Sequence, residues 1–233
     1  MPTTSLPTDL TLYSAVACNY SQRTRIALAI KGTAVDVVEV DLLHRPAAFM
    51  ATASRGSVPA LEWDGGFVYG SSTLNEFIDE QWPDPPLLPD DIVERAVARS
   101  WISLNHDKIS RPFEAALMVV DDAQTEHVLR DFDALLTDLD TRLREHWAGH
   151  AGPYWHGATM GMVDVTYAPI FARFCGLEQF HGWKLPADLD VLAAWIATLV
   201  ADPIVLATRG PEDELLAILE GYRENYRRVA AQH

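Results

Sequence analysis

The sequence predicts a two-domain protein, with an α/β domain over residues 1–89 and an all-helical domain over residues 90–233. Three observations support this division. Runs typical of strands alternate with helical runs up to residue 81, as they do in α/β folds. The proline-rich stretch at residues 82–89 can continue neither a helix nor a central strand, because proline lacks the amide hydrogen and fixes φ. Beyond this stretch we find no strand-like run of any length.

The first domain shows the order strand, helix, strand, short helix, hairpin and helix after an irregular lead-in at residues 1–9. β-Branched or alternating apolar runs predict the strands, and apolar residues three or four apart predict the helices. An Asp-Gly-Gly turn at residues 64–66 is a strong hairpin signal. We therefore predict strands at residues 10–14, 35–40, 58–63 and 67–69, helices at residues 23–31 and 73–81, and a short irregular segment between residues 44 and 56. This order favours a sheet with helices on both faces.

The second domain is predicted to be a helical bundle. Residues 92–120 predict one long helix bent at Pro112, and an apolar stripe over residues 128–143 predicts the next helix. Further helices are expected from about residue 161 and over residues 191–200. The last helix starts at Pro211, with an acidic first turn and a basic last turn, both of which complement the helix dipole.

Composition and charge place the chain among ordinary globular proteins. Of its 233 residues, 48% are hydrophobic and 22% are charged, which is typical of neither disordered nor fibrous chains. The formal net charge is −15, whereas nucleic-acid binding requires a basic surface for the phosphates. We therefore expect no nucleic-acid partner, and an anionic ligand would need a local basic pocket.

Cysteine usage and hydropathy favour a cytoplasmic protein. Cys18 and Cys175 are too few for a disulfide framework, which favours a reducing compartment. The N-terminal residues do not combine a charged segment with a following apolar run, so we expect no secretory signal. Charges interrupt each apolar stretch before it reaches the length of a membrane span, so we expect no membrane partner.

Cys18 lies where the first predicted strand gives way to a helix. The first amide groups of a helix lack internal partners and form the positive end of its dipole, which favours a thiolate there. Arg23 and Arg25 add positive charge in the first turns. Because a thiolate attacks disulfides and electrophilic carbon, Cys18 is a candidate nucleophile. The alternative is a small buried residue, since free cysteine is among the most buried residue types.

Four segments, at residues 18–26, 58–61, 69–72 and 87–96, carry motifs whose order and spacing resemble those of the cytosolic glutathione S-transferases. The first is similar to the cysteine-proline-aromatic segment of the omega and lambda classes. The second matches the turn whose proline is cis in that family. The third lies where the family has a glutamate-serine pair, and the fourth resembles its interdomain linker. The resemblance covers nearly the whole chain and implies a thioredoxin-like first domain and a homodimer.

The resemblance also implies that the first domain binds glutathione as a co-substrate, with Cys18 as the catalytic thiol. The residue before the cis proline would pair with the backbone of glutathione, and the serines would bind its γ-glutamyl group. The candidate glutathione contacts are Val58, Pro59, Ser71, Ser72, Arg45 and Tyr20.

Several of these contacts have a structural alternative. Ser71 is equally suited to cap a helix, because serine is a preferred cap residue. Arg45 fits a solvated arginine beside a proline, and Tyr20 fits an ordinary aromatic cover over the start of the helix.

The chain departs from the family pattern at four positions. Asn19 replaces the proline after the active cysteine. Ser21 stands where a dithiol would have its second cysteine, so disulfide chemistry requires an outside thiol. Gly70 replaces the glutamate of the glutamate-serine pair and offers no side chain to the ligand's amine. Gly161 replaces the serine or threonine of a capping box in the second domain, whose acidic partner Asp164 is present.

The second substrate is expected to bind against the helical domain. The candidate pocket residues are Trp101, Asn105 and His106 along the first long helix, together with Tyr13 from the first strand. The alternatives are a Tyr13 packed in the sheet and a His106 that is an ordinary surface or core histidine. Cys175 has no polar company and is expected in the core. Because we find no pair of histidines or carboxylates with metal-ligand spacing, we expect no metal.

These observations predict an enzyme that uses glutathione and a reactive cysteine for thiol transfer, conjugation or deglutathionylation of a small electrophile. Two alternatives stay open. One is a non-catalytic binding protein with the transferase fold, which Gly70 favours because the family's glutamate is lost there. The other is a transferase that uses Tyr13 or Ser14, in which Cys18 is incidental.

Overall fold

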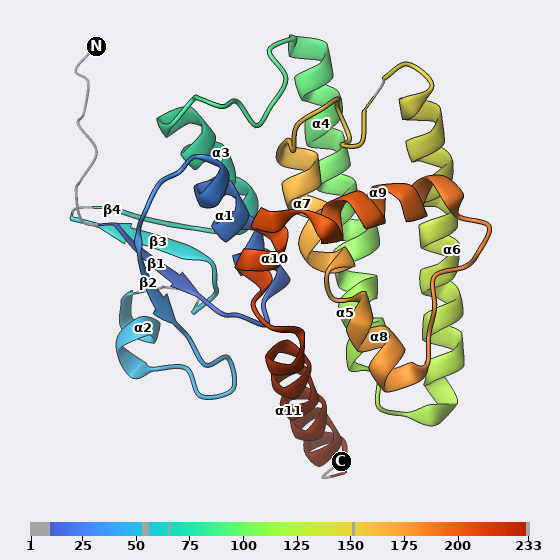
Figure 1. The fold of residues 1–233 in the computed structure, drawn as a ribbon. Coiled ribbons are helices and arrows are strands. Elements are labelled where there is room, and N and C mark those ends of the chain that lie inside the picture. Colours follow the sequence, from blue (N-terminus) through green and yellow to red (C-terminus); the bar gives the residue numbers. More distant parts are fainter. Residues whose placement is uncertain (1–9, 53–55, 65, 151, 232–233) are drawn as a thin grey trace. The chain divides into compact units, whose positions relative to one another are not determined.

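The computed structural model describes residues 10–52, 56–64, 66–150 and 152–231 (Figure 1). The predicted lead-in at residues 1–9 and the central glycine of the predicted hairpin turn lie outside this range. The chain divides into two compact units, Met1–Pro85 and Pro86–His233, and each is described by itself.

The first unit is built on a four-stranded mixed sheet, as the sequence predicts. The strands are β1 (Thr11–Ser14), β2 (Asp36–Glu39), β3 (Ala60–Trp63) and β4 (Gly66–Tyr69), in the order β2-β1-β3-β4. β1 is parallel to β2 and antiparallel to β3, and β3 is antiparallel to β4. In consequence β1 and β4 both end, and β3 begins, at the same end of the sheet.

The helices of this unit are α1 (Asn19–Ile30), α2 (Ala47–Thr52) and α3 (Ser71–Gln81). Strand side chains alternate between the two faces of the sheet. Tyr13 packs against Phe49 of α2, with the ring centroids 5.1 Å apart, while its neighbour Leu12 is fully buried. α1 and α3 pack together, and Thr24 of α1 donates a hydrogen bond to Asn75 of α3 (3.0 Å). α1 begins four residues before its predicted start, because Cys18 caps it.

The second unit is helical in its described part, apart from one isolated bridge between Tyr154 and Gly157. Its helices are α4 (Ile92–Leu104), the π-helix η1 (Asn105–Ser110), α5 (Arg111–Met118), α6 (Asp122–Trp147), α7 (Met162–Phe171), α8 (Phe174–His181), α9 (Asp190–Ala201), α10 (Pro203–Arg209) and α11 (Glu212–Ala230). The helix predicted over residues 92–120 is therefore divided in three. The π-helix ends directly before the first turn of α5, which holds Pro112, a residue without an amide hydrogen.

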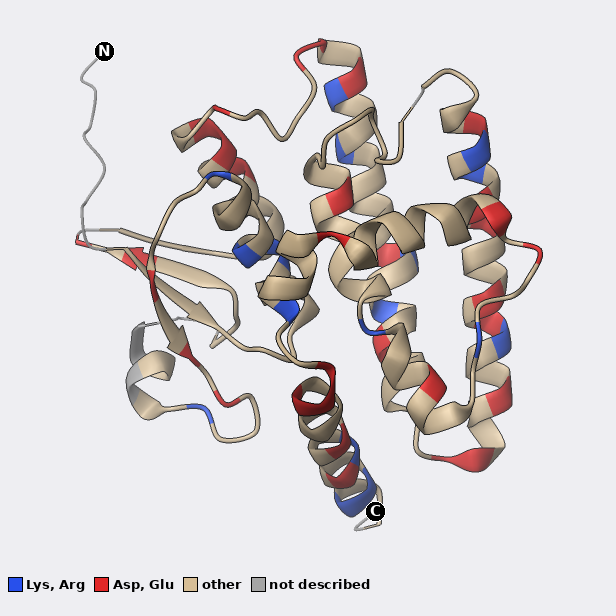
Figure 2. Ribbon diagram, in the orientation of Figure 1, with Lys and Arg blue, Asp and Glu red and all other residues tan. Residues whose placement is uncertain are grey.

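Figure 2 shows the predicted charge pattern of α11, with acidic residues in its first turn and basic residues in its last. Pro211 is the residue before the helix and not its first helical residue, so the predicted start differs by one position.

α7 is the central helix of the second unit, and all ten of its residues are buried. It contacts α4, α9 and α10. The Asp164 carboxylate lies in its first turn and accepts hydrogen bonds from the Gly161 amide (2.9 Å), the Trp155 amide (2.9 Å) and the Trp195 indole (2.7 Å). The acidic half of the predicted capping box is thus present. A Cβ at Gly161 would lie 3.1 Å from the Leu87 carbonyl oxygen, so serine or threonine there would require a small shift of this backbone.

The linker packs partly with the second unit. The Leu87 carbonyl accepts a hydrogen bond from the Met162 amide (2.7 Å), and the Leu87 side chain is buried. The structural division after Pro85 consequently precedes the one that we place after Pro89 from the sequence.

Within the described residues, a membrane-span criterion of length and composition is met by no helix taken alone. α9 and α10 meet it only when taken together, and they are bent by 67° relative to each other.

Replacing Asp164 by asparagine is expected to remove one pH dependence of stability. Burial raises the pKa of Asp164 from 3.8 to about 6. The unfolded chain therefore loses this proton at lower pH than the folded chain, and the free energy of unfolding falls as pH rises between the two values. At about 1.4 kcal/mol per pKa unit, this decrease is about 3 kcal/mol.

Urea denaturation between pH 4 and 7 measures the free energy of unfolding of the wild type and of Asp164→Asn. The difference between the two proteins isolates the contribution of Asp164, because their other titrating groups are the same. The exposed cap of α6 supplies a control, Asp121→Asn, in which the decrease caused by Asp164 should still be present. Parallel curves for the wild type and Asp164→Asn would contradict the prediction.

Candidate active site at the start of the first helix

Cys18 caps the N-terminus of α1. Its backbone is extended (φ −79°, ψ 116°), and its sulfur accepts a hydrogen bond from the Ser21 amide at 3.5 Å. The side chain is half-buried, which leaves part of it accessible. A thiol in this position lies at the positive end of the helix dipole, where negative charge is stabilised.

Arg25 supplies a cation near this cap. Its guanidinium donates to the Ser14 hydroxyl (2.9 Å) and the Val16 carbonyl (3.4 Å), and lies 3.9 Å from the Glu39 carboxylate. Burial lowers the pKa of Arg25, and the negative charges of Glu39 and of a Cys18 thiolate oppose this shift. The sequence also predicts that Arg23 adds positive charge near Cys18. In the structure the guanidinium of Arg23 lies over the Tyr20 ring, 4.6 Å from the centroid.

Tyr13 and Ser14 have structural partners. The Tyr13 hydroxyl donates to Glu62 at 2.7 Å, and this hydrogen bond is the main cause that raises the pKa of Tyr13. Ser14 is fully buried and accepts from Arg25. The raised pKa of Tyr13 and the complete burial of Ser14 both disfavour these hydroxyls as the group that activates a thiol.

The turn before β3 and the start of α3 lie side by side. The Val58–Pro59 peptide is cis, as the resemblance implies. The Pro59 carbonyl accepts a hydrogen bond from the Gly70 amide (3.2 Å), directly beyond the Ala60–Tyr69 pair of the β3–β4 ladder.

Gly70, and not Ser71, caps α3. Ser71 is the first helical residue and is buried, whereas Ser72 is exposed. The cap interpretation of Ser71 is therefore wrong by one position. Because Gly70 has φ +88°, a conformation that L residues rarely adopt, a side chain there would strain the backbone.

The sheet register brings these groups to one end of the first unit. Tyr13 pairs with Ala60, and Ala60 pairs with Tyr69, so the chain leaves β1 toward Cys18 at the end where Val58 enters β3 and Ser71 leaves β4. The N-termini of α1 and α3 therefore lie at the same end of the sheet as the cis-proline turn. Helix N-termini bind anionic groups, which suits a ligand with carboxylates and a thiolate.

Arg45 is held by the segment before this turn. Its guanidinium donates to the Gly56 carbonyl at 2.7 Å. Arg45 is otherwise exposed, so this contact is compatible with the solvated alternative as well as with a contact to a ligand.

The candidate residues of the helical unit differ in their surroundings. Trp101 is buried in an aromatic cluster with His146, Trp155 and Tyr167, at centroid distances of 5.7 to 6.3 Å. Asn105 is buried and accepts from the Ser110 hydroxyl (2.7 Å).

His106 is exposed and lies 3.3 Å from Arg111. Cys175 is half-buried, and burial raises the pKa of its thiol, which reduces its reactivity at neutral pH.

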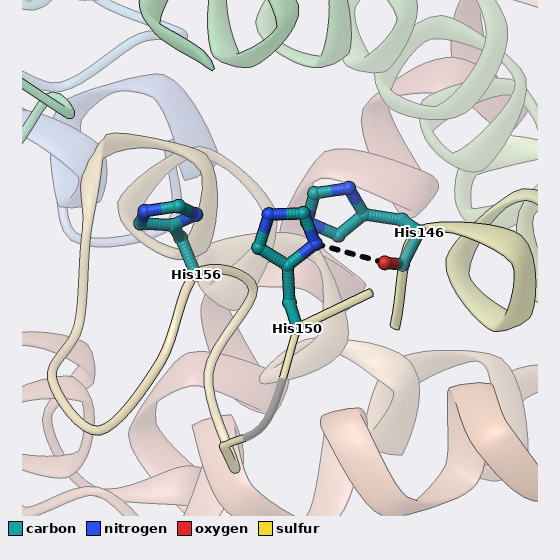
Figure 3. A group of neighbouring side chains, drawn as sticks. All are labelled: His146, His150 and His156. Carbon is teal, nitrogen blue, oxygen red and sulfur yellow. Dashed lines mark hydrogen bonds between the residues drawn. The ribbon is translucent and has the colours of Figure 1, made fainter. Parts of the chain in front are cut away.

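The sequence interpretation missed one cluster of side chains. His146, His150 and His156 come together beside Trp155 (Figure 3). The spacing of His146 and His150 at i and i+4 near a helix end is the signal that points to it, although it names only two of the three residues.

Comparison with known proteins agrees with the fold and the motifs. Residues 12–86 match the family model "Glutathione S-transferase, N-terminal domain", and residues 122–198 match "Glutathione S-transferase, C-terminal domain". The chain is 30% identical over 197 residues to a probable glutathione S-transferase, GSTU6, of Oryza sativa subsp. japonica, which covers 80% of this chain and 82% of the relative.

Two omega-class proteins are also similar. Glutathione S-transferase omega-1 of Sus scrofa is 27% identical over 92% of this chain and 86% of its own length. The crystal structure of glutathione transferase Omega 3C from Trametes versicolor is 30% identical, covers 89% of this chain and 91% of that chain, and superposes with a TM-score of 0.77. The two units thus define a thioredoxin-like domain followed by a helical domain. The chain belongs to the glutathione S-transferase family.

Introducing the family's glutamate through Gly70→Glu is expected to tighten glutathione binding and to lower stability. The carboxylate would face the ligand's amine, while the positive φ would cost about 1–3 kcal/mol. No described heavy atom lies within 4 Å of the new Cβ, so a steric clash is not expected. Calorimetric titration with glutathione and urea denaturation measure the two effects.

Gly32→Ala is the matched control. Gly32 also has a positive φ (+63°) with no described atom within 4 Å of a new Cβ, and it follows the far end of α1. This variant should lose stability without a change in glutathione affinity. An unchanged or weaker affinity in Gly70→Glu would contradict the prediction.

Proposed function

We propose that this transferase carries out glutathione-dependent thiol transfer through Cys18. The observation that carries the proposal is the position of Cys18 as the cap of α1, with its sulfur on a helix amide and Arg25 nearby. Both features place positive charge beside the sulfur, and the thiolate is the nucleophilic form of a cysteine.

Glutathione would bind in an extended conformation across the end of the sheet. The backbone of Val58, before the cis Pro59, is suited to pair with the peptide part of the ligand. Ser71, Ser72 and the amides at the start of α3 are suited to a carboxylate. These groups and Cys18 lie at one end of the sheet by register, which supports a single site for both ends of the tripeptide.

The remaining candidate contacts have weaker support. The guanidinium of Arg45 donates from one nitrogen to the Gly56 carbonyl, which leaves its other N–H groups for a second carboxylate of the ligand. Tyr20 is stacked on Arg23, which makes it a lining residue and not a hydrogen-bonding partner in this proposal.

The chemistry follows from a single thiol. The Cys18 thiolate attacks the sulfur of a glutathionyl group, an S–S bond forms, and the displaced group leaves with the bonding electrons and takes up a proton. A second glutathione, as thiolate, then attacks the glutathionyl sulfur of this mixed disulfide. Glutathione disulfide is released and the Cys18 thiolate is restored. Ser21 in place of a second cysteine requires the outside thiol.

The substrate is proposed to be a small electrophile or a glutathione conjugate. Similarity to a protein named glutathione S-transferase omega-1 and, at 28% identity, to one named probable glutathione S-transferase DHAR1 of rice favours thiol-transfer chemistry over simple conjugation. Trp101, Asn105 and His106 of the helical unit, and separately Tyr13 of the first unit, stay predictions from the sequence for contacts with this substrate. Of these, Trp101 and Asn105 have packing contacts that favour a supporting role.

Two alternatives are less well supported. A transferase that relies on Tyr13 or Ser14 is disfavoured by their contacts with Glu62 and Arg25. A non-catalytic binding protein is favoured only by Gly70, and retention on immobilised glutathione together with thiol-transfer turnover would exclude it.

Exposure to oxidised glutathione is expected to place one glutathionyl group on Cys18. Cys18→Ser should gain none, whereas Cys175→Ser should behave as the wild type, because burial raises the pKa of the Cys175 thiol. Mass spectrometry of the intact and digested protein measures the adduct. Modification of Cys175 alone, or full thiol-transfer activity in Cys18→Ser, would contradict the proposal.

A homodimer is proposed from the first turns of α4. Ile92, Val93 and Val97 are 75%, 66% and 40% exposed in a single chain, and Val93 and Val97 lie one helical turn apart. Grouped exposed apolar residues mark an interaction surface, and a second copy of the chain fits the resemblance.

Val93→Asp is expected to convert a dimer into a monomer, because a charge would be buried in the interface. Sedimentation velocity measures the mass. Val229→Asp, which changes an exposed valine of α11, should leave the dimer intact. A wild type that sediments with the mass of one chain would refute the proposal.

A further inference from the structure

The helical unit contains a group of three histidines apart from the glutathione chemistry. One ring nitrogen from each of His146, His150 and His156 lies within 4.8 Å of the other two. His146 lies in the last turn of α6, His150 follows that helix, and His156 comes from the loop before α7 (Figure 3). We propose that these three histidines bind a divalent transition-metal ion, for which Zn²⁺ is the probe.

Hydrogen bonds leave one lone pair on each ring. A ring nitrogen of His146, Nε2, lies 2.9 Å from the Trp155 carbonyl, and Nδ1 of His150 lies 2.9 Å from the His146 carbonyl. Carbonyl oxygens only accept, so these nitrogens carry the hydrogens and the other nitrogen of each ring keeps its lone pair. Metal-binding histidines in proteins are oriented in this way.

His156 completes the pattern through a carboxylate. Its Nε2 lies 3.2 Å from Oε2 of Glu94, and its buried Nδ1 has no hydrogen-bond partner within the described part of the chain. A buried ring nitrogen without a partner costs free energy, which a bound ion would recover. Glu94 also lies 3.9 Å from His150, so its negative charge is placed next to two of the three rings.

Ring stacking holds the cluster together. The His146 ring stacks on Trp155 and on His150, each at a centroid distance of 4.2 Å, with interplanar angles of 9° and 15°. Trp155 is fixed in turn by its amide hydrogen bond to Asp164.

An ion can reach the cluster from solvent. The side chains of His150 and His156 are 30% and 33% exposed, and that of Glu94 is 43% exposed. His156 and Trp155 also line a cavity of about 250 Å³ between the linker and the start of α7.

The donor set selects the class of ion. Three imidazoles with a nearby carboxylate suit Zn²⁺, Co²⁺, Ni²⁺ or Cu²⁺, whereas Mg²⁺ and Ca²⁺ prefer all-oxygen sites. Water would supply the fourth ligand, because Glu94 lies on Nε2 of His156, the nitrogen that faces away from the proposed ion. Such an ion would link the end of α6 to the loop before α7 and keep one open coordination position.

Calorimetric titration of chelator-treated protein with ZnCl₂ at pH 7.5 tests the proposal. The titration uses the full chain with Cys18→Ser, which removes the candidate nucleophilic thiol as a competing ligand. One Zn²⁺ per chain is expected, with a rise in Tm by mass action. Co²⁺ in place of Zn²⁺ should give the visible absorption of a tetrahedral site.

Variants assign the site. His150→Ala and His156→Ala should each weaken Zn²⁺ binding by at least about tenfold. His127→Ala, on an exposed part of α6, should bind as the parent does. His156→Gln gives a second, milder change should His156→Ala not fold. Absence of binding at 100-fold excess of Zn²⁺, or equal binding by the folded cluster variants, would overturn the proposal and leave the histidines as packing residues. Neither result bears on the Cys18 chemistry.

Discussion

The register of the four-stranded sheet is the constraint on which the candidate active site depends. Because β1 and β4 are both antiparallel to β3, the chain leaves β1 and β4 at the end where it enters β3. Cys18, the cis-proline turn and the start of α3 meet there although more than 50 residues separate the first from the last. If the register of β1 slipped by one residue, each β1 side chain would move to the other face of the sheet. Tyr13 would then no longer contact Phe49. A change that disrupts the pairing of the strands would therefore also disrupt the site.

In the helical unit, one buried carboxylate has a comparable role. Asp164 accepts three hydrogen bonds, and one of them fixes the backbone of Trp155. Trp155 stacks on His146, so the capping of α7 and the arrangement of the histidine cluster are coupled. Burial of this carboxylate costs free energy, as the raised pKa indicates, and its hydrogen bonds offset part of that cost. The loop before α7 is therefore held by polar contacts and not by apolar packing alone.

Local signals predict most elements, and the errors have local causes. The strands and the hairpin follow from alternation and turn residues, and the sheet of the structure contains all four. The start of α1 is missed by four residues because a cysteine is not among the usual caps. The π-helix before α5 is missed because an apolar stripe does not distinguish it from a bent α-helix. Ser71 is displaced from the cap because glycine, which alone tolerates φ +88°, takes that position.

The sequence by itself determined the family, the two-part organisation and the placement of Cys18 between a strand and a helix, because these depend on residues close together in the chain. The tertiary structure decided which side chains that are distant in the sequence contact one another. It pairs Tyr13 with Glu62, and it brings His156 to His146 and His150. Such contacts depend on strand register and on the path of a loop, and both are set by packing between distant segments, which local patterns do not encode.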